Sequence, residues 1–267
     1  MKERTELKLL TNVSIAFVYR EPGFGSETVS QSYMAENLEH LETDRDWYRV
    51  KQEDGYEAWI PTSFVVQKPE DWDDHDFFFP QNQISRILDS PDHHASALRD
   101  ITQLSGLPIL NTEDDWVEVL LPDGKRGWLK GNPRPLPATV DIEQLIETAH
   151  SFLGIQYFWG GRSPKGFDCS GFVQTCFKLN GMLLPRDAYQ QADIGEQVSD
   201  NLDAWQVGDL IYFSERPERI THVAISLGGG KFIHASGFVK INSLNPDHEE
   251  IYTKKYADIY TKTMRVL

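Results

Sequence analysis

The residue best suited to chemistry in this sequence is Cys169, which lies between Asp168 and Ser170 at the expected start of a helix over residues 169–179. Asp168 is a suitable N-cap for that helix. Backbone N–H groups at a helix start stabilise an anion, and this position lowers the pKa of a cysteine. Because the thiolate is the nucleophilic form, the position suits covalent catalysis. Taken alone, Cys169 could also be a buried structural cysteine, which is what we expect of Cys176.

Two histidines provide the partners that a catalytic cysteine needs. His222 begins an apolar stretch, three glycines follow it, and His234 lies in the returning stretch. A hairpin closed symmetrically about Gly229 places both histidines on one face as diagonal neighbours, with roughly 7–8 Å between their backbones. One imidazole would then accept the proton of Cys169 while the other fixes its tautomer. A two-residue turn would instead place the histidines on opposite faces.

Metal binding is the alternative use of these residues. One cysteine and two histidines allow a zinc site with water as the fourth ligand, but no Cys-x-x-Cys or His-x-x-x-His pair supports it. The acidic stretch 70–76 lacks the glycine and the ligand periodicity of an EF-hand loop, so we expect a solvated linker there. We therefore predict neither a metal site nor a cofactor.

The elements around these residues predict an α+β domain over residues 139–267. Apolar residues recur at helical spacing over 142–153, with Asp141 near the start. The helix of Cys169 follows, and strand-like stretches dominate beyond Trp205. A helical half followed by an antiparallel sheet is typical of the α+β order.

An internal repeat occupies the first half of the chain. The pattern Trp-x-x-Val-x-x-x-Asp-Gly-x-x-x-Trp-(Ile/Leu) occurs over residues 47–60 and again over residues 116–129. Each copy predicts a β-hairpin in which Asp-Gly supplies the positive φ angles of a tight turn. Strand-like segments flank the copies, at Ile15, Phe17 and Tyr19 and at residues 84–88. We expect two small all-β barrels, near residues 5–68 and 80–132; two hairpins inside one larger sheet are the alternative.

Composition excludes several classes of protein. The 267 residues carry a net charge of −15, which argues against binding to nucleic acid or to an anionic membrane. Cys169 and Cys176 lie too far apart on one helix for a disulfide, which suits a reducing compartment. No stretch is typical of a membrane-spanning helix or a signal peptide. With Met1 as the natural start we expect a cytoplasmic monomer; an upstream export signal would make the protein secreted.

Motifs in both halves resemble known families. The repeated hairpin resembles the bacterial SH3-like (SH3b) domain, which implies SH3b domains over residues 1–68 and 75–135. The motifs of the second half are Tyr157-x-Trp159-Gly160-Gly161, Phe167-Asp168-Cys169-Ser170-Gly171-Phe172, Gly208-Asp209-Leu210, Thr221-His222-Val223-Ala224-Ile225 and Phe232-Ile233-His234-Ala235. Together they resemble the NlpC/P60 family of papain-like cysteine peptidases, which implies a peptidase domain over residues 139–267.

The resemblance implies roles for individual residues. Cys169 matches the nucleophile, His222 the base and His234 the orienting third member of the site. Ala188 departs from the family pattern, because a serine that often contacts substrate stands at this place in relatives. The other matching positions are Tyr157, which assists the oxyanion and the substrate carbonyl; Asp168, Ser170, Trp159, Arg186 and Asp187, which bind substrate; and Tyr56 with Glu27 or Glu21, which read a free N-terminal amine from the first SH3b domain.

The layout of two SH3b domains before the peptidase is similar to γ-D-glutamyl-L-diamino acid endopeptidases of the dipeptidyl-peptidase VI type. The resemblance implies cleavage of short murein peptides with a free N-terminal L-Ala, before diaminopimelate or Lys, in cell-wall peptide recycling. Two alternatives are a non-catalytic SH3b protein that binds peptide or cell wall, and a related thiol amidase.

Overall fold

The computed structural model describes residues 7–133, 135–216 and 219–267. Its internal contacts divide the chain into two units, residues 1–136 and residues 137–267, and each is described by itself. No helix in the described part of the chain is long and apolar enough to cross a membrane.

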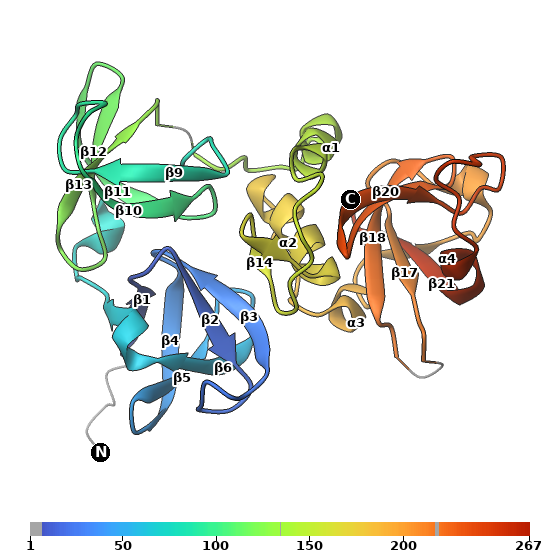
Figure 1. Cartoon of the computed structure of the whole chain (residues 1–267), viewed down its shortest axis with the longest axis horizontal. Coiled ribbons are helices and arrows are strands. Elements are labelled where there is room, and N and C mark those ends of the chain that lie inside the picture. Colours follow the sequence, from blue (N-terminus) through green and yellow to red (C-terminus); the bar gives the residue numbers. More distant parts are fainter. Residues whose placement is uncertain (1–6, 134, 217–218) are drawn as a thin grey trace. The chain divides into compact units, whose positions relative to one another are not determined.

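The first unit begins with a seven-stranded sheet in the order β3-β2-β6-β5-β4-β1-β7 (Figure 1). All its strand pairs are antiparallel. The predicted hairpin of residues 47–60 is the pair β5–β6, so this prediction is confirmed. The strands are β1 (Lys8–Thr11), β2 (Ile15–Tyr19), β3 (Thr28–Tyr33), β4 (Asn37–Asp44), β5 (Trp47–Lys51), β6 (Glu57–Pro61) and β7 (Val65–Gln67), with a 3₁₀ turn at Thr62–Phe64.

A six-stranded sheet follows, in the order β10-β9-β13-β12-β11-β8. This order matches the order β3-β2-β6-β5-β4-β1 of the preceding sheet. Strand β10 corresponds to β3, β9 to β2, and so on to β8, which corresponds to β1. The second predicted hairpin is the pair β12–β13. The strands are β8 (Phe77–Phe78), β9 (Ile84–Leu88), β10 (Ala97–Thr102), β11 (Leu107–Glu113), β12 (Trp116–Leu120) and β13 (Arg126–Lys130).

The two hairpin turns differ from the prediction in one respect. Gly55 and Gly124 have φ angles of +82° and +78°, whereas the aspartates before them do not have positive φ. Each loop holds five residues between its strands, which is longer than the expected tight turn. Glycine alone therefore supplies the left-handed conformation, which residues with a Cβ adopt at a cost.

The strand-like segment at Ile15, Phe17 and Tyr19 is strand β2. Its alternation does not separate a buried face from an exposed one, because Ala16, Val18 and Tyr19 are all buried while Phe17 is 37% exposed. Residue size is therefore a poor guide to burial on this strand.

The acidic stretch 70–76 is more than a solvated linker. A 3₁₀ turn at Trp72–Asp74 interrupts it, and the indole of Trp72 is only 1% exposed. Trp72 packs in a core that includes Leu10, Met34 and Ile101, and so unites strands of both sheets. The carboxylates face solvent while the single aromatic residue is anchored.

Replacing Trp72 with alanine is therefore expected to lower the free energy of unfolding of the first unit by about 3–5 kcal/mol, because it removes a large buried side chain. Asp71→Ala changes an exposed neighbour and should cost under about 0.5 kcal/mol. Urea unfolding followed by fluorescence measures both. Equal stability of the two variants would contradict the anchoring role of Trp72.

The second unit starts with the predicted helices. Helix α1 (Ile142–Ser151) has Asp141 as its N-cap, and α2 (Cys169–Leu179) has Asp168, as the sequence indicated. Leu153 was expected on the helix, but it lies beyond it and is 46% exposed. Cys176 is fully buried in the core, and both cysteines are free thiols. The remaining short elements are α3 (Ala188–Gln191), α4 (Lys254–Ile259), a 3₁₀ turn at Leu202–Ala204, and the two-residue strands β14 (Arg162–Ser163) and β15 (Gly166–Phe167).

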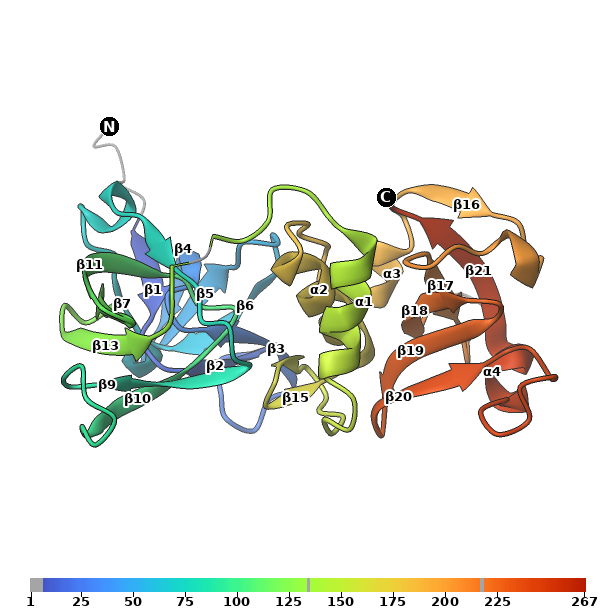
Figure 2. The same ribbon diagram turned by 90° about the horizontal axis from the view of Figure 1, so that it is seen from above.

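An antiparallel six-stranded sheet completes this unit, in the order β16-β21-β17-β18-β19-β20, and confirms the α+β organisation. Figure 2 shows α1 and α2 beside each other on one side of this sheet. Residues such as Val223, Ile225 and Ile233 pack toward these helices, while Ala224 and Phe232 pack into a separate core on the opposite face. The strands are β16 (Glu196–Val198), β17 (Leu210–Phe213), β18 (His222–Gly228), β19 (Lys231–Ser236), β20 (Phe238–Ser243) and β21 (Tyr260–Arg265).

Candidate active site

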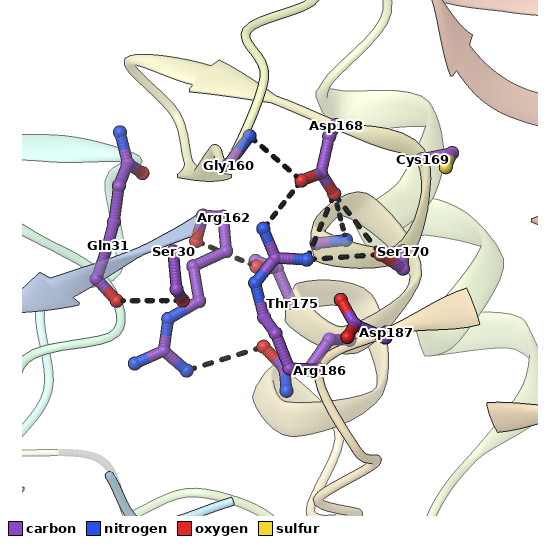
Figure 3. A network of polar contacts seen from close by, with 12 residues as sticks. Ser30, Gln31, Gly160, Arg162, Asp168, Cys169, Ser170, Thr175, Arg186 and Asp187 are labelled. Atoms are coloured by element: carbon purple, nitrogen blue, oxygen red, sulfur yellow. Dashed lines mark hydrogen bonds and ion pairs between the residues drawn. The ribbon is translucent and has the colours of Figure 1, made fainter. Parts of the chain in front are cut away.

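The carboxylate of Asp168 organises the start of α2. Its Oδ1 accepts the backbone N–H of Gly171 at 2.7 Å, which is the N-cap bond, and the hydroxyl of Ser170 at 3.3 Å. Its Oδ2 accepts the backbone N–H of Gly160 at 3.0 Å, so the glycine loop before the helix is tied to the same group. Figure 3 shows these donors converging on one carboxylate beside Cys169.

Arg186 completes this network from the loop before α3. Its Nη2 lies 2.5 Å from Oδ2 of Asp168, and its Nη1 donates to Oδ1 at 3.1 Å and to the Ser170 hydroxyl at 3.0 Å. The Arg186 side chain is 1% exposed and that of Asp168 11%, so the two charges compensate each other in a largely buried site. The next residue, Asp187, is the N-cap of α3, and burial raises the pKa of its carboxyl. Three substrate-binding candidates, Asp168, Ser170 and Arg186, are thus joined directly.

Breaking the buried pair is expected to cost far more than breaking an exposed one. Arg186→Met removes one partner and leaves the Asp168 charge uncompensated, so the free energy of unfolding should fall by about 3–5 kcal/mol. Lys254→Met breaks the exposed ion pair with Asp258, and should cost at most about 1 kcal/mol. Chemical denaturation of both variants measures the difference, and equal losses would contradict this ranking.

The thiol of Cys169 is buried against the start of β18. The residue is 8% exposed, and its Sγ lies 4.0 Å from the carbonyl oxygen of Thr221, the residue just before His222. Burial raises the pKa of the Cys169 thiol to about 12, and the nearby Asp168 charge acts in the same direction. The backbone N–H groups of Val223 and Ser170 lower this pKa, but less strongly. The helix start therefore does act to lower the pKa, as expected, but desolvation outweighs the N–H groups and the net pKa is raised.

The two histidines lie as the symmetric hairpin predicted. Ser226 pairs with Phe232 and Ile225 with Ile233, so the register is centred on Gly229. Nε2 of His222 lies 2.7 Å from Nδ1 of His234, which is within hydrogen-bond distance.

The hydrogen-bonded chain continues beyond the histidines. Nε2 of His234 lies 3.0 Å from Oδ1 of Asn242, whose Nδ2 donates to the carbonyl oxygen of Ile251 at 3.1 Å. A chain of four polar groups therefore runs from the strand next to Cys169 to the loop after β20.

Burial keeps both imidazoles neutral. It lowers the pKa of His234 to about 4, against the opposing effect of the Asn242 hydrogen bond. It also holds the pKa of His222 well below its ordinary value, and His234, Lys255 and Lys240 add to that shift. Together with the raised pKa of Cys169, these directions describe a neutral thiol beside neutral imidazoles.

We therefore expect no thiolate on Cys169 near neutral pH in the free protein. The ultraviolet thiolate absorbance should be the same for the native protein and for Cys169→Ala at neutral pH, and a difference should develop only in strongly alkaline solution. Cys176→Ala is the control for the second thiol, whose pKa burial also raises. A neutral-pH thiolate signal lost only in Cys169→Ala would contradict the neutral state.

The other predicted site residues of the second unit differ in how much of their side chains is exposed. Tyr157 is half-buried; burial and the neighbouring Cys169 and Asp168 raise the pKa of its phenol, which places it beside the thiol. Trp159 is 61% exposed in the loop before Gly160. Ala188, where the family resemblance predicts a serine, is buried at the first position of α3.

The three remaining candidates belong to the first unit. Glu27 forms an ion pair with Arg20 at 2.7 Å. Glu21 is exposed, and its backbone N–H donates to Ser26. Tyr56 follows the Gly55 turn and is half-buried. Their assignment to amine binding stays a prediction.

Sequence reasoning missed two residues of the site. Tyr256, from α4, stacks on the His222 ring with centroids 5.4 Å apart and an angle of 29° between the planes, and its hydroxyl donates to Ser236 at 2.8 Å. Asn242 was missed although a signal existed, because the Gly237 turn that pairs β19 with β20 places it on the face of His234. For Tyr256 no local pattern was available, since α4 is far along the chain.

Metal ligation finds no support in the part of the chain that the structure describes. Within residues 7–133, 135–216 and 219–267, no three His, Cys, Asp or Glu side chains are grouped so that they could hold a metal ion. The third neighbour of the histidine pair is the amide of Asn242.

Comparison with known proteins agrees with the arrangement of the chain. The model of the NlpC/P60 family matches residues 154–261, and that of the bacterial dipeptidyl-peptidase SH3 domain matches residues 18–64. The chain is 29% identical to a γ-D-glutamyl-L-lysine dipeptidyl-peptidase of Bacillus cereus, over 85% of this chain and 73% of that protein. It is 39% identical to the murein DD-endopeptidase MepS/murein LD-carboxypeptidase of Escherichia coli, over 49% of this chain and 67% of that protein.

A solved structure shares the whole fold. The crystal structure of an NlpC/P60 family protein from Bacillus cereus superposes with a TM-score of 0.83 at 25% identity, covering 97% of this chain and 99% of that one. An SH3-like domain of strands therefore precedes an NlpC/P60 domain. The chain belongs to the NlpC/P60 family and is a hydrolase of the cysteine peptidase class.

Proposed function

We propose that this protein is a cysteine endopeptidase that cleaves the γ-D-glutamyl-L-diamino acid bond of short murein peptides. The observation that carries the proposal is the 2.7 Å contact between His222 and His234, with the Cys169 thiol 4.0 Å from the carbonyl oxygen of Thr221, the residue before His222. The name of the Bacillus cereus relative, a γ-D-glutamyl-L-lysine dipeptidyl-peptidase, supports the substrate class. Free N-terminal L-Ala, a role in recycling and a cytoplasmic location stay predictions.

In this proposal Cys169 is the nucleophile and His222 the base. As Sγ attacks the γ-carbonyl carbon, the thiol proton passes to His222, because a neutral thiol must lose its proton during attack. Backbone N–H groups at the start of α2 stabilise the oxyanion. Protonated His222 then gives the proton to the leaving amine, and the C–N bond breaks. Water, deprotonated by His222, hydrolyses the thioester and releases the D-glutamyl peptide.

The Asp168–Arg186 network suits recognition of the substrate. A D-glutamyl residue linked through its γ-carboxyl group has a free α-carboxylate, and an L-Ala before it brings an N-terminal amine. Asp168, Ser170, Asp187, Tyr157 and Trp159 are proposed to contact these groups. Arg186 is buried and engaged with Asp168, so we propose that it holds the Asp168 carboxylate in place.

We further propose that the second sheet of the first unit is a second SH3b domain, with boundaries near residues 75–135. The repeated hairpin sequence and the matching order of six strands in both sheets support this. The shared core around Trp72 joins the two sheets, which fits two domains that fold against each other.

Turnover of defined peptides tests the function. The native protein should convert L-Ala-γ-D-Glu-L-Lys into L-Ala-D-Glu and Lys, detected by mass spectrometry, and should leave the α-linked isomer intact. Cys169→Ala should lower the rate by about a thousandfold or more, because removal of a nucleophile abolishes the covalent route. Cys176→Ala is the matched control and should retain turnover.

Two results would contradict the proposal. Full turnover by Cys169→Ala would exclude Cys169 as the nucleophile. Equal cleavage of the γ-linked and α-linked peptides would exclude recognition of the γ-glutamyl bond. Replacing Lys by diaminopimelate in the same assay determines the preferred diamino acid.

A further inference from the structure

Asn242 extends the histidine pair on the face of the sheet opposite the helices. In the antiparallel pairing of β19 with β20, His234 lies opposite Lys240 and Phe232 opposite Asn242. Cross-strand partners share a face, and so do residues two apart, so Asn242 lies diagonally from His234 on the same face. Its Oδ1 is 3.0 Å from Nε2 of His234.

The orientation of the Asn242 amide follows from its other partner. Its Nδ2 donates to the carbonyl oxygen of Ile251 at 3.1 Å, and the same oxygen accepts the backbone N–H of Ser243 at 2.8 Å. A backbone carbonyl can only accept a hydrogen bond, so the NH₂ group must face Ile251. The amide oxygen therefore faces His234.

The donors along the rest of the chain are then determined. Because the Asn242 oxygen only accepts, Nε2 of His234 must carry the hydrogen. A neutral imidazole carries one hydrogen, so Nδ1 of His234 is bare and accepts from Nε2–H of His222. This leaves Nδ1 of His222 as the ring nitrogen of the pair with a lone pair outside the chain.

We propose that Asn242 is a positioning residue that fixes the tautomers of His234 and His222, so that Nδ1 of His222 is the nitrogen that accepts the Cys169 proton. The inference rests on the proposed function for the roles of Cys169 and His222. Without the Asn242 acceptor, His234 could carry its hydrogen on Nδ1 and donate to Nε2 of His222. Nδ1 of His222 would then be protonated and unable to act as a base.

The charges around the pair explain why an amide, rather than a carboxylate, matters at this position. Lys240 on β20 and Lys255 on α4 disfavour a positive charge on the imidazoles, and Lys255 is paired with Glu215 at 2.7 Å. Tyr256 on α4 contacts both rings, and Cys169 interacts electrostatically with Tyr256 and with Tyr157. A neutral amide fixes the hydrogen-bond direction and favours the imidazolium less than a carboxylate would, so burial still keeps the base unprotonated at neutral pH.

Two substitutions separate these effects. Asn242→Leu and Asn242→Asp both lose the donor to Ile251, but only the aspartate keeps an acceptor for His234. We expect Asn242→Leu to lower kcat by about tenfold to a hundredfold with little change in KM, because part of the protein holds the wrong tautomer. Asn242→Asp should keep kcat within a few-fold of native on the alkaline plateau.

The pH profile gives the readout that a merely structural role would not move. The negative charge of Asn242→Asp favours the imidazolium, so the acid limb of kcat/KM should move up by about one pH unit or more. Asn180→Leu removes another buried amide, which donates to the Cys176 carbonyl and lies outside the histidine chain. Its acid limb should stay at the native position.

Side-chain ¹⁵N spectra of the histidines test the inference without turnover. Native protein should show both His222 and His234 as Nε2–H tautomers near neutral pH, and Asn242→Leu should show Nδ1–H signals. A native Nδ1–H tautomer on His222 would overturn the inference, even if Asn242→Leu does not fold. So would equal losses of kcat in both Asn242 variants with an unmoved acid limb.

Failure of the inference is distinguishable from failure of the proposed function. If Cys169→Ala abolishes turnover while Asn242→Leu keeps native kcat, pH profile and tautomers, the function stands and the positioning role is excluded. If Cys169→Ala retains turnover, the proposed function itself is wrong, and the native tautomers alone then decide the assignment of Asn242.

Discussion

The constraint on which the second unit depends is the burial of the Asp168 carboxylate. An isolated buried carboxylate is strongly disfavoured, so its surroundings must provide donors, and they come from the glycine loop, the first turn of α2 and Arg186. Satisfying this one group fixes the segment before α2, the helix start and the loop before α3 relative to one another. Cys169, the next residue, is thereby placed at the edge of β18.

The neighbouring chain of hydrogen-bonded polar groups contains no charge, unlike the Asp168–Arg186 pair. His222, His234, Asn242 and the Ile251 carbonyl are linked without any formal charge. Burial disfavours charge on the imidazoles, and two lysines disfavour it further. The site therefore combines a compensated ion pair at the start of α2, next to Cys169, with an uncharged hydrogen-bonded chain that begins at His222 on β18.

Sequence patterns predicted the elements that local chemistry determines. The N-caps Asp141 and Asp168 and the register about Gly229 depend on neighbours within a few residues, so a periodicity argument is sufficient. Trp72 was misplaced because its burial depends on strands from two sheets. Tyr256 was missed for the same reason, because its contact with the His222 ring depends on long-range packing and not on local sequence.

The pKa of Cys169 shows why a position in the chain does not by itself determine reactivity. A helix start and two backbone N–H groups favour the thiolate, as the sequence indicated, but they act within a site that is almost fully closed to water. Desolvation removes the hydration that would stabilise the charge of the thiolate, and the N–H dipoles replace only part of that stabilisation. A substrate that brings its own polar groups changes that balance, because the developing negative charge moves from sulfur to the carbonyl oxygen. The same N–H groups that fail to stabilise a resting thiolate are then available to the oxyanion.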